Sequence, residues 1–369
     1  MAKKVGLICA PELPETIAEN IYEELIDYFN RQVDDNYDWE IEIVVDPLTG
    51  AAESSKEIID AALSIAKKRE WDYTICLTDL PLFEDNKIIL ADLNQKLNIA
   101  QISLPAFGSP PMRYRVKKVI MQIMQELHFN HTKDDVHKMK QAIKHLFKRN
   151  LRFSPIKREE VSMDQNKAMI RYLVVPKINS KLRTILGMSY ANRPWAVISS
   201  FKPIIAVAFA TGAYALIFPN LWELSVHYNV PRLLGIMFIA CMSMIIWMIV
   251  SHNLWENKTK NSKRKIRRLY NTTTVTTLTM AVSVYYIVLF IIFSIAIVIF
   301  IPPELFRTMT ESEGEVGILA FLRLSWLATS VATLAGSIGA SAENAELVRN
   351  IAYGYRQNRR YQEVKKQKD

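Results

Sequence analysis

Four long apolar runs in the second half of the chain constrain its fold more than any other feature. They occupy residues 204–218, 233–255, 271–303 and 316–342, and short polar joints separate them. The hydrocarbon core of a bilayer is about 30 Å thick, so a helix needs roughly 20 apolar residues to cross it. Each run reaches that length when its flanks are counted. Buried helices of a large soluble core are the alternative, but four such runs in succession favour an all-α, four-helix transmembrane domain at residues 201–343.

The charges of the joints predict which ends of the spans face the cytoplasm. The joint at 257–271 holds seven Lys and Arg and no acidic residue, and the tail at 344–369 holds seven more. The joint at 304–315 holds one Arg and four Glu. Lys and Arg accumulate on the cytoplasmic side of membrane proteins. The pattern therefore predicts a multi-pass plasma-membrane protein with both termini in the cytoplasm.

Charge is also segregated along the N-terminal half. Residues 1–110 hold 9 Lys and Arg against 21 Asp and Glu, whereas residues 111–200 hold 19 against 6. Basic segments beside a bilayer are typical of contact with anionic lipid headgroups, and we identify no nucleic-acid-binding motif. The apolar stretch at 5–10 is too short for a signal-peptide core. We therefore expect a cytoplasmic domain at 1–110, a basic helical connector at 111–200 and a basic cytoplasmic tail at 344–369.

Alternating patterns in the first 110 residues predict a cytoplasmic α/β domain. Strand-like runs alternate with two amphipathic helices, and this β-α-β-α-β order predicts a mostly parallel sheet. The connector should add helices and one strand, and its helix at 180–191 either lies in the bilayer interface or packs on the soluble domain. The predicted strands are 4–10, 39–46, 71–79, 87–91, 100–104 and 168–175, and the predicted helices are 15–32, 53–69, 112–129 and 133–150.

Four polar residues lie at the carboxyl ends of predicted parallel strands and are the candidate ligand-facing residues. They are Glu12, Asp46, Thr78 and Asp79. Open α/β sheets bind ligands at the carboxyl ends of their strands. Turn and cap chemistry is the alternative role for Asp46, Thr78 and Asp79. The first turn, residues 9–14, contains no glycine that would admit a phosphate against the backbone, so we predict no nucleotide site and no cofactor.

One cluster of titratable residues could suggest catalysis or zinc binding. It comprises Glu126, His128, His131, Asp134, Asp135 and His137. Zinc proteases carry His-Glu-x-x-His, which places two imidazoles one helical turn apart. Gln125 and Phe129 occupy the two positions where that motif requires histidine, so we predict no metal site and no catalytic residue. Cys9 and Cys76 lie in strand-like runs without CxxC spacing, which indicates small core residues.

The fourth apolar run carries a stripe of small residues at a spacing of four. Its members are Ala328, Ala332, Gly336 and Ala340. Small residues let helices approach closely in lipid. The partner helix belongs either to the same chain or to a second copy, so a homo-oligomer through this span is one expectation.

Two stretches resemble known families. Residues 72–108, with LTDLPL at 77–82 and ISLPAFG at 102–108, resemble the scaffold of archaemetzincin-like proteases, which implies that fold without its zinc motif. Residues 181–195, KLRTILGMSYANRPW, resemble a family of uncharacterised multi-pass membrane proteins of Gram-positive bacteria that pair a cytoplasmic α/β domain with a membrane half. Some members are labelled methylene-tetrahydrofolate dehydrogenase, and no glycine-rich dinucleotide turn supports that activity here.

These observations favour a membrane-anchored regulatory or interaction module whose non-catalytic cytoplasmic domain binds a ligand or partner. A small transporter or channel subunit is the alternative. Arg323 is the one charged residue within residues 316–342, and scarce intramembrane charge counts against ion coupling. An enzyme such as a folate dehydrogenase is a lesser alternative.

Overall fold

A computed structural model describes most of the chain, which divides into two compact units. The α/β unit comprises Met1–Ala191 together with Arg356–Asp369, and the helical unit comprises Asn192–Tyr355. The described residues are 2–50, 55–84, 87–108, 110–129, 156–163, 167–175, 177–256, 264–311, 316–339 and 345–368.

The α/β unit is built on one mixed sheet with the strand order β2-β1-β3-β6-β5-β8-β7, and β4 pairs with β5. The first four strands in this order run parallel, as the β-α-β-α-β pattern predicted. The remaining pairs are antiparallel. The strands are β1 Ala2–Cys9, β2 Asp38–Val45, β3 Tyr73–Thr78, β4 Leu82–Glu84, β5 Lys87–Asn94, β6 Ile99–Ser103, β7 Ile156–Met163 and β8 Lys167–Val174.

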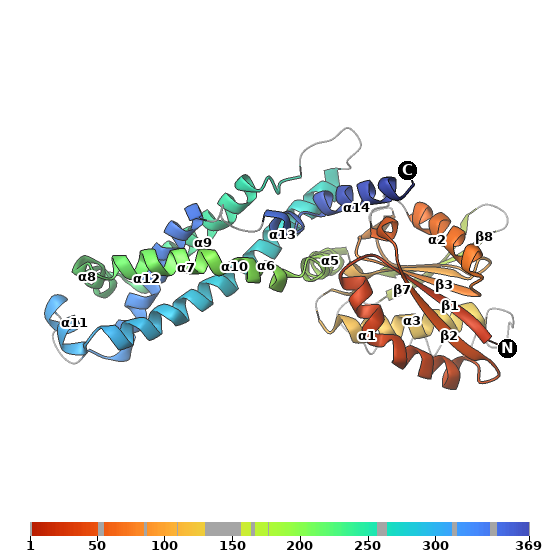
Figure 1. Cartoon of the computed structure of the whole chain (residues 1–369), viewed down its shortest axis with the longest axis horizontal. Coiled ribbons are helices and arrows are strands. Elements are labelled where there is room, and N and C mark those ends of the chain that lie inside the picture. Colours follow the sequence, from red (N-terminus) through yellow and green to blue (C-terminus); the bar gives the residue numbers. More distant parts are fainter. Residues whose placement is uncertain are drawn as a thin grey trace. The chain divides into compact units, whose positions relative to one another are not determined.

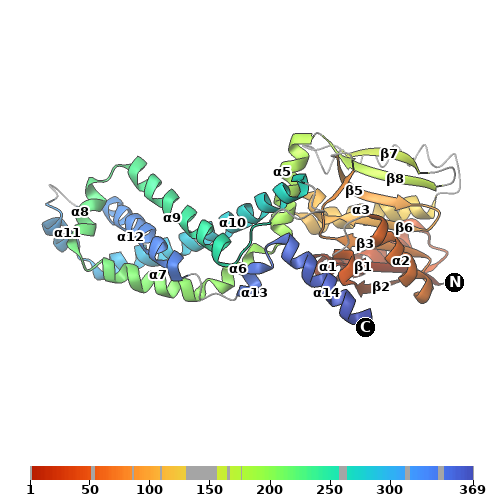
Figure 2. The same ribbon diagram turned by 90° about the horizontal axis from the view of Figure 1, so that it is seen from above.

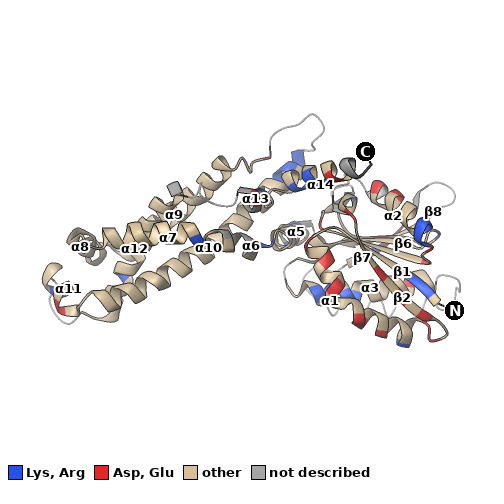
Figure 3. Cartoon of the chain, viewed as in Figure 1, with Lys and Arg blue, Asp and Glu red and all other residues tan. Residues whose placement is uncertain are grey.

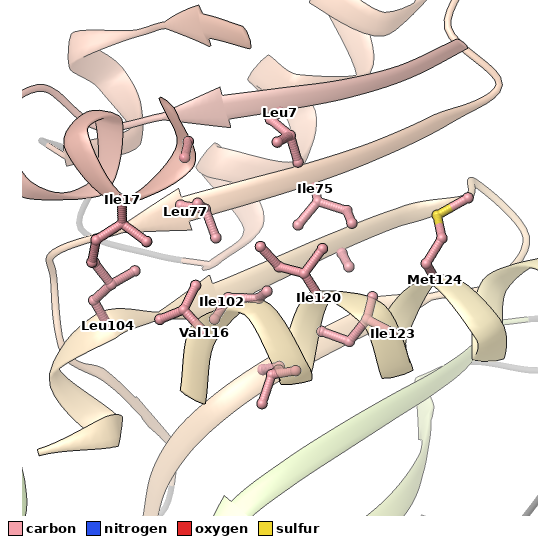
Figure 4. Close-up of a cluster of buried hydrophobic side chains, with 14 of the residues drawn as sticks. Leu7, Ile17, Ile75, Leu77, Ile102, Leu104, Val116, Ile120, Ile123 and Met124 are labelled. Atoms are coloured by element: carbon pink, nitrogen blue, oxygen red, sulfur yellow. The ribbon is translucent and has the colours of Figure 1, made fainter. Parts of the chain in front are cut away.

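Helices cover both faces of this sheet (Figure 1). Helices α1 (Leu13–Tyr28, with a π-helical turn to Val33) and α3 (Met112–His128) share one apolar core with the strands. Helix α2 (Ser55–Arg69) packs on the opposite face. In the core of Figure 4, strand residues such as Leu7 and Ile75 meet Val116 and Ile120 of α3. The spacing of apolar residues at every third or fourth position explains why each helix buries one face.

The α/β unit extends beyond the range 1–110 that we expected from the sequence. Helix α3 is buried along its apolar face, and the hairpin β7–β8 adds two strands at the edge opposite β2 (Figure 2). Helix α5 (Lys177–Ala191) also packs within this unit, so close to the 3₁₀ turn Leu104–Phe107 that a Cβ at Gly187 would lie 2.3 Å from the Pro105 carbonyl oxygen. The sequence predicted the helices at 112–129 and 180–191 and the strand at 168–175, but it did not predict β7 or the pairing of β8 with β5. The helix expected at 133–150 lies outside the described residues.

Among its described residues, the helical unit has three helices long and apolar enough to cross a membrane, α9, α10 and α12, and one bent pair, α7 and α8, that together pass the same test. Figure 3 shows few charged residues along them. The helices are α6 Pro194–Ser200, α7 Lys202–Ala215, α8 Pro219–His227, α9 Val230–Ser251, α10 Arg264–Phe300, α11 Pro303–Met309, α12 Ile318–Gly339 and α13 Ala345–Arg349, and α14 Tyr353–Lys368 begins here and continues into the α/β unit.

The first predicted span is not one straight helix. Helix α7 ends at Ala215, and the chain bends by 92° before α8. Proline disfavours helical backbone at the preceding residue, and Phe218, before Pro219, is extended with φ −89° and ψ 116°. Helix α7 alone, at about 1.5 Å per residue, is shorter than a bilayer core.

The small-residue stripe of α12 faces other helices of the same chain. Ala328, Ala332 and Gly336 are buried. A Cβ at Gly336 would lie 2.9 Å from the Tyr285 hydroxyl of α10 and 3.0 Å from the Ala208 Cβ of α7. The described part of the stripe therefore packs against other helices of the same chain. Ala340 lies outside the described residues.

Candidate binding site at the carboxyl edge of the sheet

The topology places a switch point between the carboxyl ends of β1 and β3. Strand β1 pairs with β2 on one side and β3 on the other, and the chain leaves β1 through α1 toward β2 but leaves β3 toward β4, β5 and β6 on the other side. Chains leaving such neighbouring strands diverge, which is where open α/β sheets bind ligands. Glu12 follows β1 and Asp79 follows β3, so the two carboxylates flank this point.

Two arginines from the C-terminal helix α14 converge on Asp79. Arg360 donates from Nη1 to Asp79 Oδ1 at 2.8 Å, and Arg356 Nη2 lies 3.3 Å from Asp79 Oδ2. The two arginines are four residues apart, so both project from one face of α14. Each carboxylate oxygen of Asp79 thus faces a different guanidinium group.

Glu12 extends this arrangement on the β1 side. Its carboxylate lies 3.4 Å from Arg359 Nη2 and 3.9 Å from Arg356 Nη1. Arg360 also donates from Nη2 to the Pro11 carbonyl oxygen at 3.2 Å. Glu12 has φ +75°, a conformation that is rare outside glycine and that accompanies functional sites when the surrounding structure holds it. We call Pro11, Glu12, Asp79, Arg356, Arg359 and Arg360 the switch-point cluster.

The three charged side chains at the centre of the cluster are buried. Asp79 and Arg360 are each 1% exposed and Arg356 is 2% exposed. Burial would raise the pKa of Asp79, but the positive charges of Arg360 and Arg356 outweigh it and hold that pKa below its ordinary value. Arginine stays charged at any pH that proteins meet. The cluster is therefore a buried ionic site whose integrity depends on every partner being present.

The other two predicted site residues belong to the neighbouring turns. Thr78 donates from Oγ1 to the Thr49 carbonyl oxygen at 2.6 Å and accepts from the Leu80 backbone N–H at 3.1 Å. Asp46 accepts from Thr49 Oγ1 at 3.3 Å. These hydrogen bonds are typical of turns, and a turn role was the alternative that the sequence left open for Asp46 and Thr78. The structure thus brings Glu12 and Asp79 together on the tail arginines and places Asp46 and Thr78 beside them.

The titratable residues of α3 have separate partners. Glu126 is buried and bonded to the Tyr172 hydroxyl, with Arg158 Nε at 3.4 Å. Burial raises the pKa of Glu126, although Tyr172 and Arg158 oppose the shift. His128 instead contacts Asp34 and the Tyr73 hydroxyl, each at 3.0 Å. Within the described ranges, no group of three or more His, Cys, Asp and Glu could hold a metal ion. His131, Asp134, Asp135 and His137 lie outside those ranges.

Cys9 and Cys76 are core residues, as their strand-like surroundings predicted. Both are 0% exposed. Burial raises the pKa of each thiol far above its ordinary value. Because the thiolate is the reactive form, neither cysteine is poised for nucleophilic or metal chemistry.

Sequence reasoning missed the three tail arginines of the cluster. The tail charges were interpreted as a retention signal for the cytoplasmic side. The signal that could have identified them is the pair Arg356 and Arg360, spaced by one helical turn in a chain whose N-terminal domain is acidic. Comparison with known proteins supplies no further guide, because no family model, curated protein or solved structure matches this chain.

Proposed function

We propose that this chain is a multi-pass membrane protein whose cytoplasmic α/β unit is a non-catalytic regulatory binding module, and that its own C-terminal helix occupies the binding site. The observation that carries this proposal is the burial of Arg356 and Arg360 against Asp79 at the switch point. In an open α/β sheet this position usually receives the ligand. A segment of the same chain that fills it controls access to it.

The helical unit supports the membrane part of the proposal because its outer surface is apolar. Large apolar side chains on α9 and α10 are widely exposed, including Val250 at 70% and Phe300 at 78%. Polar side chains such as Thr277 and Thr333 are instead buried. An apolar surface of this kind needs a covering, and lipid supplies it. The basic joint at 257–271 and the basic tail then assign both termini to the cytoplasm, beside anionic lipid headgroups.

The transporter alternative has less support from the helical unit. Tyr286 of α10 bonds to Ser330 of α12 at 2.8 Å. Thr277 and Thr329 donate to backbone carbonyls one turn earlier at 2.9 and 2.7 Å. Tyr286 and Ser330 thus bond to each other between two helices, whereas Thr277 and Thr329 are satisfied within their own helices, and both arrangements favour a structural role for these four residues.

Trypsin tests the docking of α14, because it cleaves after the arginines that the cluster buries. The purified full chain in neutral-lipid nanodiscs should resist cleavage at Arg356 and Arg360. Asp79→Asn removes the carboxylate charge shared by both guanidinium groups, so these bonds should be cut much faster, while cleavage outside α14 stays unchanged.

Glu363→Gln is the matched control for this experiment. Glu363 pairs with Arg359 on the exposed side of α14 at 3.5 Å, and such surface pairs contribute about 0–1 kcal/mol. The control should cleave like the wild type. Rapid cleavage at Arg356 and Arg360 in the wild type, or identical rates in the wild type and Asp79→Asn, would refute an α14 that occupies the site.

A further inference from the structure

We propose that α14 is shared between two anionic partners, the switch-point cluster and an anionic phospholipid surface, which compete for the same arginines. This inference rests on the proposed function and adds the lipid that regulates the site. It assigns to α14 a second docking surface, the headgroup region of an anionic bilayer.

The charge of α14 fits such a surface. Residues 353–368 hold six Lys and Arg and one acidic residue, Glu363. Three arginines engage the two carboxylates of the cluster, and Lys365, Lys366 and Lys368 follow them. A basic helix beside a membrane gains affinity for anionic lipid with every Lys or Arg that nears the surface.

The aromatic residues of α14 add the second feature of an interfacial helix. Tyr355 is 38% exposed and Tyr361 is 50% exposed in the docked state. A tyrosine side chain has an apolar ring and a polar hydroxyl, so it is favoured at an interface where the ring contacts apolar groups and the hydroxyl contacts water. Helices that lie on membranes combine basic and aromatic side chains in this way.

The start of α14 is fixed to the ends of the apolar helices within the helical unit. The Tyr353 ring stacks on Tyr270 of α10, with 5.3 Å between centroids. The Gly354 backbone N–H donates to Glu256, which follows α9, at 2.7 Å. This is the basic end of α9 and α10, which the proposed topology assigns to the negatively charged cytoplasmic leaflet. At about 1.5 Å per residue, every basic residue of α14 is therefore within reach of the headgroups.

Competition follows from the chemistry of the guanidinium group. Arginine forms charge-assisted hydrogen bonds with carboxylates and with phosphates in the same geometry. Arg356 and Arg360 cannot be buried against Asp79 and bind lipid phosphates at the same time. Anionic lipid should therefore compete with the cluster for α14. When the cluster is weakened, a larger fraction of α14 should bind lipid.

A fluorophore on α14 measures this exchange. We would place it at Gln362→Cys, an exposed position, in a Cys241→Ala background, since Cys9 and Cys76 are buried. The full chain is placed in nanodiscs of phosphatidylcholine alone or with phosphatidylglycerol, each containing a spin-labelled quencher lipid. Phosphatidylglycerol should increase the quenching of the fluorophore. Asp79→Asn should increase it further, but only in nanodiscs that contain phosphatidylglycerol.

A lysine variant separates lipid binding from docking at the cluster. Lys365→Gln, Lys366→Gln and Lys368→Gln together leave the three arginines intact. Each basic residue near an anionic surface contributes about fivefold to binding, so the triple variant should weaken lipid binding by roughly a hundredfold and abolish the added quenching.

Two outcomes would overturn the inference. One is an Asp79→Asn variant that is quenched no more in anionic than in neutral nanodiscs. The other is quenching that the lysine substitutions do not change. Neither result touches the proposed function, because trypsin resistance in neutral nanodiscs tests the docking of α14 independently of lipid charge.

Discussion

At the scale of single residues, Asp79 has the largest consequences for the α/β unit. It is a buried carboxylate whose two oxygens face Arg360 and Arg356. Removing one member of a buried ion pair leaves an uncompensated charge, which typically costs about 3–5 kcal/mol. Release of α14 relieves part of that cost in the Asp79→Asn variant, since α14 can leave the cluster and take its arginines into water. We therefore expect the measured loss of stability to fall at or below the lower end of this range.

The contribution of Asp79 should depend on pH with a defined sign. The arginines hold the pKa of Asp79 in the folded protein below its ordinary value, which is about 3.9 in an unfolded chain. A depressed carboxylate pKa stabilises the folded state above the unfolded pKa, and that stability is lost as pH falls through the folded pKa. The difference in thermal midpoint between the wild type and Asp79→Asn should thus be full at neutral pH and shrink below about pH 4.

Thermal unfolding of both proteins in the same detergent, from neutral pH downward, measures this difference. A difference that widens as the solution becomes acidic would contradict the assigned role of Asp79.

At the scale of elements, the contact of α12 with α7 and α10 depends on Gly336. The Tyr285 hydroxyl and the Ala208 Cβ lie where a side chain at this position would project. Lipid supplies little hydrophobic force to restore a contact once the helix backbones are pushed apart. These three helices can therefore approach closely because glycine at position 336 has no side chain.

Gly336→Leu should loosen the helical unit by about 1–3 kcal/mol, as overpacked cores do. Leu334→Ile, a volume-conserving change at a half-buried position of the same helix, is the control and should have little effect. Thermal stability and particle size in detergent are measured for the two variants side by side. Equal stability of the two variants would show that the stripe does not carry packing between these helices.

At the scale of the whole molecule, the proposed function depends on the membrane topology, that is, on the side of the bilayer where the α/β unit and the C-terminal tail lie. The α/β unit and the tail can meet only if both lie on the same side of the bilayer. The tail residues 356–369 belong to the α/β unit, which agrees with the side that the basic joints assign to both termini.

Reporter fusions test this topology directly. A reporter after Asp369 and one within residues 258–268 should both be cytoplasmic, because Lys and Arg are retained on that side. A reporter beside Ser312 should be external. An external C-terminus would rule out an even number of spans beginning from a cytoplasmic α/β unit.

The sequence alone determined the features that depend on local periodicity. The β-α-β-α-β order, the apolar length of α9, α10 and α12 and the helical character of 112–129 all follow from patterns within single segments. The side-chain repeat of a strand or a helix requires no knowledge of distant residues. The same reasoning found Glu12 and Asp79, because both lie at the carboxyl ends of predicted strands.

Only the tertiary structure decided which distant segments meet. The hairpin β7–β8 joins the sheet through pairing with β5, and the bend between α7 and α8 ends the first predicted span near the end of its apolar run. The clearest case is Asp79 and Arg360, which are 281 residues apart in the chain. Local pattern shows that one is acidic and the other basic, but burying both charges requires complementary shape and several simultaneous contacts, which exist only once the sheet and the helix are assembled.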